Sequence, residues 1–302
     1  MRVLIATDGS KHAAAAMTAA CRILSAENRC IDLLCVVPEA GTKAPTRAPT
    51  KALIKNGLSD KLQRRATRIL EKARHALAEQ GVSARPLLEH GSAIKTLLRA
   101  SLQYDLTVVG AKSRNDDSPS GLGPVASRII EHSTASVLVG REGRNDTGLR
   151  ILVPVDGSDL ALGALDKLVS LVDLSTADVT LMHVVEKPWL AAPDQELFEE
   201  EEDQTDPESQ LTHEFERELE REAESVIEEA RSHLPTRTAV NRVIESGLPA
   251  DAILAEAERG DYDLVVMAAS GSHDMKHQLL GSVSVKVTWD APCSVFLVRS
   301  AA

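Results

Sequence analysis

Residues 2–10 read RVLIATDGS and residues 150–158 read RILVPVDGS, so the chain opens twice in the same way, 148 positions apart. Further matches between the two halves follow in the same order: YDLTVVGAKS at 104–113 with YDLVVMAASG at 262–271, and LGPVASRI at 122–129 with LGSVSVKV at 280–287. Matches that run through both halves in one order indicate tandem copies of one domain. We therefore predict one domain over residues 1–140 and a second over residues 150–300.

Each copy alternates short apolar runs of strand length with amphipathic runs of helix length. In the first copy Val3–Thr7 is the first expected strand, and a helix should begin after Ser10, whose hydroxyl can accept from the free N–H groups of the first turn. The strands are continuously apolar, which is typical of strands buried on both faces. We predict an α/β fold in which each copy forms an open, mostly parallel five-stranded sheet flanked by helices. Ligands of such sheets bind beyond the carboxyl ends of the strands.

The charge is divided unevenly between the copies. The 302 residues carry 34 Lys and Arg against 45 Asp and Glu, a net charge of −11. Residues 1–146 hold 22 basic and 14 acidic residues, and the remainder holds 12 basic and 31 acidic. Much of the acidic excess lies in an insertion of the second copy at about 186–237, which we interpret as a solvated loop followed by a long helix, with metal binding or acidic docking as the alternative. This division, with only 2% aromatic residues, argues against a nucleic-acid partner.

A basic helix is expected in the first copy at about 57–80. Its cationic side chains form either a solvated face or a contact for an acidic surface, such as the insertion of another copy of the chain. These side chains are Lys61, Arg64, Arg65, Arg68, Lys72 and Arg74.

The cysteines and the hydropathy bear on where the protein works. Cys21, Cys30, Cys35 and Cys293 show no CxxC spacing, and such thiols are typical of a reducing compartment. No apolar run approaches the roughly 18–20 residues that a membrane span needs, and no signal peptide is visible. We expect a cytoplasmic protein without a membrane partner.

A glycine-containing segment after the fourth strand of the second copy has the character of a phosphate site. It reads Met267-Ala268-Ala269-Ser270-Gly271, then nine residues, then Gly281-Ser282. Glycine lets backbone amides approach phosphate oxygens without a Cβ in the way. Gly281-Ser282 should open a helix, whose free N–H groups and dipole favour an anion.

With these residues the sequence resembles the universal stress protein family, whose nucleotide-binding members carry G-x2-G-x9-G-[S/T] at this point. The resemblance covers both copies and includes Asp8 and Asp156, which end the first strands. It implies an adenine nucleotide alpha hydrolase-like fold and binding of ATP, with Mg alongside, mainly by the second copy. Ala268 replaces the first glycine of the motif. The residues implied for nucleotide binding are Pro154, Val155, Asp156, Val184, Met267, Ala268, Gly271, Gly281, Ser282 and Val283.

The first copy keeps less of the motif. Ser113 replaces the second glycine, and Pro124 replaces the Ser or Thr and removes an N–H donor. Turn and helix-start geometry alone would also account for Gly110 and Gly123. The weaker second site comprises Asp8, Val36, Val109, Gly110, Ser113 and Gly123.

The resemblance also suggests how the copies associate. Single domains of the family commonly pair through their last strands, so we expect Val137–Val139 and Val295–Val298 to pair within one chain, which would protect two apolar edges. A homodimer and an unknown protein partner remain open. The expected output is a stress-response signal carried by conformation or partner contacts.

Catalysis is not expected from the residues themselves. We find no general base, nucleophile or metal set for fast turnover; His273 and His277 are taken as surface residues and His183 as a core histidine. Slow ATP hydrolysis, a trait of the family, is the most that the resemblance allows. Two alternatives stay open: a scaffold that binds no nucleotide, and a carrier or enzyme for another nucleotide-linked or acyl metabolite.

Overall fold

The computed structural model describes residues 1–24, 29–38, 49–112, 121–143, 148–186, 207–270 and 280–299, with residues 49–58 and 207–213 described by their backbone only. The first half contains β1 (Arg2–Ala6), α1 (Lys11–Ile23), β2 (Cys30–Val37), α2 (Pro49–Glu79), β3 (Ala84–His90), α3 (Ala93–Ser101), β4 (Leu106–Gly110), α4 (Pro124–His132) and β5 (Ser136–Gly140). The second half contains β6 (Leu149–Pro154), α5 (Asp159–Leu171), the short 3₁₀ helix η1 (Leu174–Thr176), β7 (Ala177–Val185), α6 (Pro207–Ser232), β8 (Ala239–Ser246), α7 (Pro249–Arg259), β9 (Leu264–Ala268), α8 (Ser282–Asp290) and β10 (Ser294–Val298).

The strands of both halves form one ten-stranded sheet, in the order β3-β2-β1-β4-β5-β10-β9-β6-β7-β8. In the described part of the chain every neighbouring pair is parallel except β5 and β10, which run antiparallel with Leu138 opposite Phe296. The predicted α/β class with an open, mostly parallel sheet is confirmed, and so is the pairing of the last strands. The two sheets that the sequence suggests are therefore continuous, because this pairing removes an edge from each.

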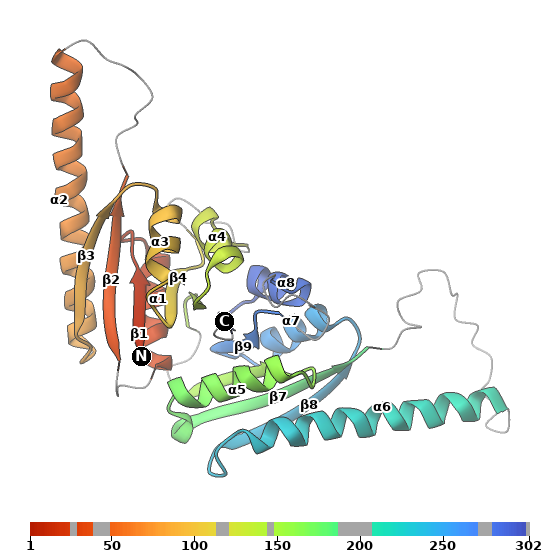
Figure 1. Ribbon diagram of the computed structural model, residues 1–302. Coiled ribbons are helices and arrows are strands. Elements are labelled where there is room, and N and C mark those ends of the chain that lie inside the picture. Colours follow the sequence, from red (N-terminus) through yellow and green to blue (C-terminus); the bar gives the residue numbers. More distant parts are fainter. Residues whose placement is uncertain are drawn as a thin grey trace.

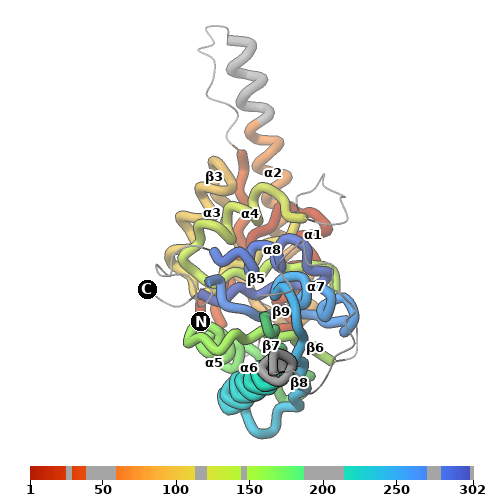
Figure 2. Tube along the Cα trace, turned by 90° about the vertical axis from the view of Figure 1, so that its right-hand side faces the viewer, coloured from red at the N-terminus to blue at the C-terminus, as the bar shows by residue number. Residues whose placement is uncertain are grey.

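The helices cover the two faces of the sheet in two groups (Figure 1). The apolar sides of α1, α2, α5 and α6 pack in one core, and those of α3, α4, α7 and α8 pack in the other. Each core contains residues from both halves, so the junction at β5 and β10 is buried on both faces. Figure 2, turned by 90°, shows α2 and α6 at opposite ends of the molecule.

The long helices differ in how closely the sequence predicted them. Helix α6 begins at Pro207, one residue from the expected start. Helix α2 begins at Pro49, eight residues before the expected position 57. Gly57 suggested a boundary, but one glycine inside a helix costs only about 1 kcal/mol, and proline suits the first helical position.

Buried arginines connect the halves at equivalent positions, 158 residues apart. Arg141 Nη2 donates to the carbonyl oxygen of Thr288 at 2.7 Å, near the end of α8. Arg299 Nη2 donates to that of Ile130 at 2.6 Å, near the end of α4. Burial lowers the pKa of Arg141 to about 10 and also lowers that of Arg299. Each half thus satisfies the last carbonyl groups of a helix in the other half.

A buried carboxylate joins β2 to β3 and to the segment before β4. Asp32 accepts from Arg85 at 2.8 and 2.6 Å and from the Tyr104 hydroxyl at 2.5 Å. The hydrogen bond from Arg85 is the main cause that holds the pKa of Asp32 below its ordinary value. Because the folded state lowers this pKa, the contribution to stability is present above the unfolded value of about 3.9 and is lost as the pH falls through the folded value.

Asp32→Asn should therefore lower the free energy of unfolding at pH 7 by about 1–3 kcal/mol, the range for a buried hydrogen bond to a charged group. The difference from the wild type should shrink in acid, as followed by urea unfolding at several pH values. Glu131→Gln is the control, since its exposed pair with Arg128 is worth at most about 1 kcal/mol. An equal loss for Asp32→Asn at neutral and acid pH would contradict the expectation.

Candidate nucleotide site

A cavity of about 400 Å³ lies at the carboxyl ends of the strands of the second half. It is formed where β6, β7 and β9 end and where α8 begins. Nine of the ten residues that the sequence suggested line it, whereas Gly271 lies outside the described residues. These nine are Pro154, Val155, Asp156, Val184, Met267, Ala268, Gly281, Ser282 and Val283.

The start of α8 gives this cavity an anion-binding end. Gly281 caps the helix, and its N–H donates to the carbonyl oxygen of Ala269 at 2.9 Å. The Ser284 hydroxyl donates to the carbonyl oxygen of Ala268 at 2.9 Å, which fixes the first turn against the end of β9. The first N–H groups of a helix have no acceptor within the helix, so those following Gly281 are available to an anion, together with the exposed Ser282 hydroxyl.

The walls of the cavity are largely apolar, with carboxylates at the strand ends. Val155 and Met267 are buried and Val184 is half-buried. Asp156 is exposed, and its Oδ1 accepts from the backbone N–H of Ser158 at 3.1 Å and from its hydroxyl at 2.5 Å. Apolar walls with a few placed polar groups are typical of small-molecule sites of 300–1,000 Å³.

The cavity also includes residues that sequence reasoning missed. Glu186 follows the last residue of β7, so the rule that ligands bind at carboxyl ends could have found it. Pro249 and Ile253 come from α7, and Leu280 precedes the cap of α8. No signal in the sequence places α7 beside this cavity, because that neighbour is set by tertiary packing.

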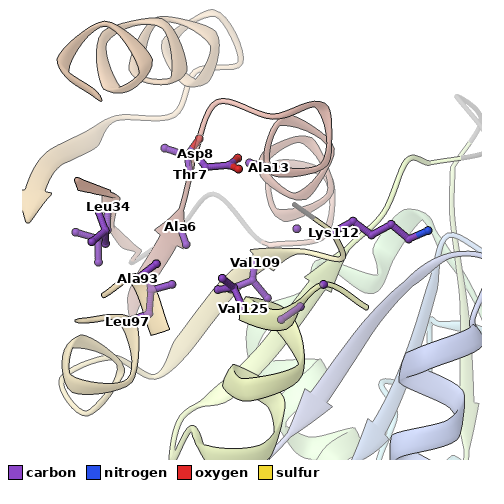
Figure 3. A pocket seen from close by; sticks show the side chains of 14 residues that line it. Ala6, Thr7, Asp8, Ala13, Leu34, Ala93, Leu97, Val109, Lys112 and Val125 are labelled. Atoms are coloured by element: carbon purple, nitrogen blue, oxygen red, sulfur yellow. The ribbon is translucent and has the colours of Figure 1, made fainter. Parts of the chain in front are cut away.

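The corresponding cavity of the first half is much smaller, about 110 Å³. Figure 3 shows its lining: Ala6, Leu34, Leu97 and Val109 surround an apolar space, and the Lys112 side chain extends away from them. Of the weaker set that the sequence suggested, Ser113 lies outside the described residues. The others line the cavity: Asp8, Val36, Val109, Gly110 and Gly123.

Two glycines of the first half explain part of this difference. Gly110 and Gly140 are paired between β4 and β5, and α1 lies directly against them. A Cβ on Gly110 would come within 2.7 Å of the carbonyl group of His12, and one on Gly140 would overlap the Cα of Ala16. Ala268 and Val298 are the corresponding pair in the second half, so α5 cannot lie as close to the sheet there. Gly110 is thus required by helix packing, which neither turn geometry nor a ligand had suggested.

The described residues offer little for catalysis. They contain no group of three or more His, Cys, Asp or Glu side chains that could hold a metal ion. His183 is half-buried, and its Nδ1 lies 2.8 Å from the carbonyl oxygen of Val155, whereas His273 and His277 fall outside the described residues. No described helix is both long and apolar enough to cross a membrane.

Comparisons with known proteins agree with this architecture. A universal stress protein of Bacillus subtilis is 28% identical over 161 residues, which cover 98% of that protein and 50% of this chain. One of Methanocaldococcus jannaschii is 28% identical over 151 residues, covering 81% of that protein. The crystal structure of a universal stress protein from Archaeoglobus fulgidus matches 99% of this chain and 98% of its own, with a TM-score of 0.66 at 20% identity, and so shares the fold. The family model described as "Universal stress protein family" matches twice, at residues 1–141 and 149–299, and the chain therefore belongs to that family.

Proposed function

We propose that the second half binds ATP or a related adenine nucleotide, and that the protein acts in the cytoplasm as a regulator whose conformation or partner contacts respond to that binding. The observation that carries the proposal is the start of α8, which opens into a cavity of about 400 Å³ with apolar walls. The first half is proposed not to bind the nucleotide, because its cavity of about 110 Å³ is below the usual size of ligand sites.

The residues of the larger cavity suit different parts of such a ligand. The phosphates would accept from the N–H groups after Gly281 and from the Ser282 hydroxyl. Aliphatic side chains such as Val184 and Met267 would enclose the adenine, and Asp156 would lie near the nucleoside, as the family resemblance implies. Among the described lining residues, Asp156 and Glu186 carry the carboxylates that a Mg²⁺ ion entering with the phosphates could meet.

Gly281→Asp tests the site directly. The backbone of Gly281, with φ −66° and ψ 149°, is open to aspartate, and aspartate is a good helix cap, so the fold should be retained. Its carboxylate would occupy the anion end of the cavity and repel phosphates. Isothermal titration of the wild type with ATP should show about one site per chain, and the variant should bind at least about tenfold more weakly, as expected when charge-assisted hydrogen bonds are lost.

Gly123→Asp is the matched control, because Gly123 caps α4 in the same way and lines the small cavity. It should leave ATP binding unchanged. A flat titration of the wild type would overturn the proposal and favour a protein that acts through contacts alone. An equal loss in both variants would show that the binding does not depend on the second half.

A further inference from the structure

The outer side of α2 carries a row of exposed basic side chains. Lys61, Arg65, Arg68 and Lys72 follow one another at spacings of four, three and four residues, so they lie on one side of the helix, with Arg64 beside Arg68. We call these five residues the basic row. Among the described residues none of the five has a hydrogen bond or an ion pair, while the opposite side of α2 packs in the core. The row extends over about 17 Å of helix.

The outer side of α6 carries a row of opposite charge. Glu214, Glu218, Glu222 and Glu229 are exposed and follow at spacings of four, four and seven residues, and we call them the acidic row. Glu218 pairs with Arg221 on the same helix at 2.6 Å, and the other three have no ion pair with a described residue. This row extends over about 22 Å, a length similar to that of the basic row.

The fold keeps the two rows apart within one molecule. Helix α2 packs on β2 and β3 at one end of the strand order, and α6 packs on β7 and β8 at the other end. Both helices belong to the core on the same face of the sheet, and both views of the molecule show them at opposite ends (Figures 1 and 2). The rows can therefore neutralise each other only between two molecules.

We propose that the basic row of one copy binds the acidic row of a second copy, so that the chain associates head to tail. Such a contact uses a different surface on each partner, so it continues into a longer assembly or closes into a ring. The charge of residues 1–146 and that of the remainder, +8 and −19, favour the same orientation during encounter. Each exposed ion pair contributes little alone, so the association depends on several pairs and on low salt.

Sedimentation velocity of the full chain measures the proposal. At about 20 mM salt, where the Debye length is roughly 20 Å, the sedimentation coefficient should rise with protein concentration. At about 500 mM salt, where the Debye length is roughly 4 Å, the apparent dissociation constant should be at least about tenfold larger. A chain that stays monomeric at low salt would overturn the proposal and direct attention to other acidic partners for α2. An oligomer that salt does not weaken would also overturn it and point to the sheet edges.

Charge reversal then identifies the surfaces. One variant carries Arg64→Glu, Arg65→Glu and Arg68→Glu, and the other carries Glu214→Lys, Glu222→Lys and Glu229→Lys. Each should fail to associate alone, because both of its rows then have the same sign. A mixture of the two should associate again, and so should one chain carrying all six changes. A mixture that remains monomeric would contradict the proposed contact.

A third variant controls for net charge. Lys95→Glu, Arg99→Glu and Arg128→Glu are exposed changes on α3 and α4, on the opposite face of the sheet, and shift the net charge by the same amount as the α2 variant. This variant should associate like the wild type, and circular dichroism should show that all variants are folded. Loss of association in the control would mean that overall repulsion, rather than the basic row, decides the result.

Discussion

Gly140→Ala is expected to lower the free energy of unfolding by about 3 kcal/mol, at the upper end of the cost of overpacking a core. The new Cβ would overlap the Cα of Ala16 and lie 2.6 Å from its Cβ. A flexible side chain could turn away, but a backbone atom moves only if the whole of α1 moves. Helix α1 packs on β4 and β5 and contributes Ala16 and Ala20 to the core, so its displacement disturbs many contacts.

Urea unfolding of Gly140→Ala and Gly163→Ala measures this difference. Gly163 lies inside α5, and a Cβ there meets no atom within 4 Å. Gly163→Ala should stabilise the protein by about 0.5–1 kcal/mol, because glycine is a poor helix former. If Gly140→Ala left the stability within about 0.5 kcal/mol of the wild type, the size of a neutral surface change, α1 would not be held as closely as we describe.

Leu138→Ala is expected to cost about 3 kcal/mol, within the range for truncating a buried leucine. Leu138 is 1% exposed and lies opposite Phe296 where β5 meets β10. Since the core around it includes residues of both halves, the loss should destabilise both halves together. Urea unfolding followed by circular dichroism and by tryptophan fluorescence should give coincident transitions, shifted to lower urea.

Leu102→Ala is the matched control, because Leu102 is 67% exposed and a surface change of this kind stays within about 0.5 kcal/mol. Transitions that separate in Leu138→Ala, with one half unchanged, would contradict a shared core.

The two cavities show how far a motif can be trusted. At the first motif position the first half keeps glycine and the second half has Ala268, so motif matching alone favours the first half at this point. The structure shows that Gly110 leaves room for the backbone of α1, which is unrelated to a phosphate. The larger cavity is found where the motif glycine is missing. A glycine that matches a binding motif can therefore reflect helix packing instead.

The sequence by itself determined the repeat, the succession of strands and helices, and most residues of the candidate site. It could do so because local patterns select each element, and because parallel strands bring their carboxyl ends to one edge. The pairing of Val137–Val139 with Val295–Val298 followed from family resemblance and was observed.

Only the tertiary structure decided the sizes of the cavities, the neighbours from α7, and the placement of the basic and acidic rows at opposite ends. Each depends on distances between segments far apart in the chain, such as Gly140 and Ala16. Packing sets those distances through atom-by-atom contacts that composition and periodicity do not contain.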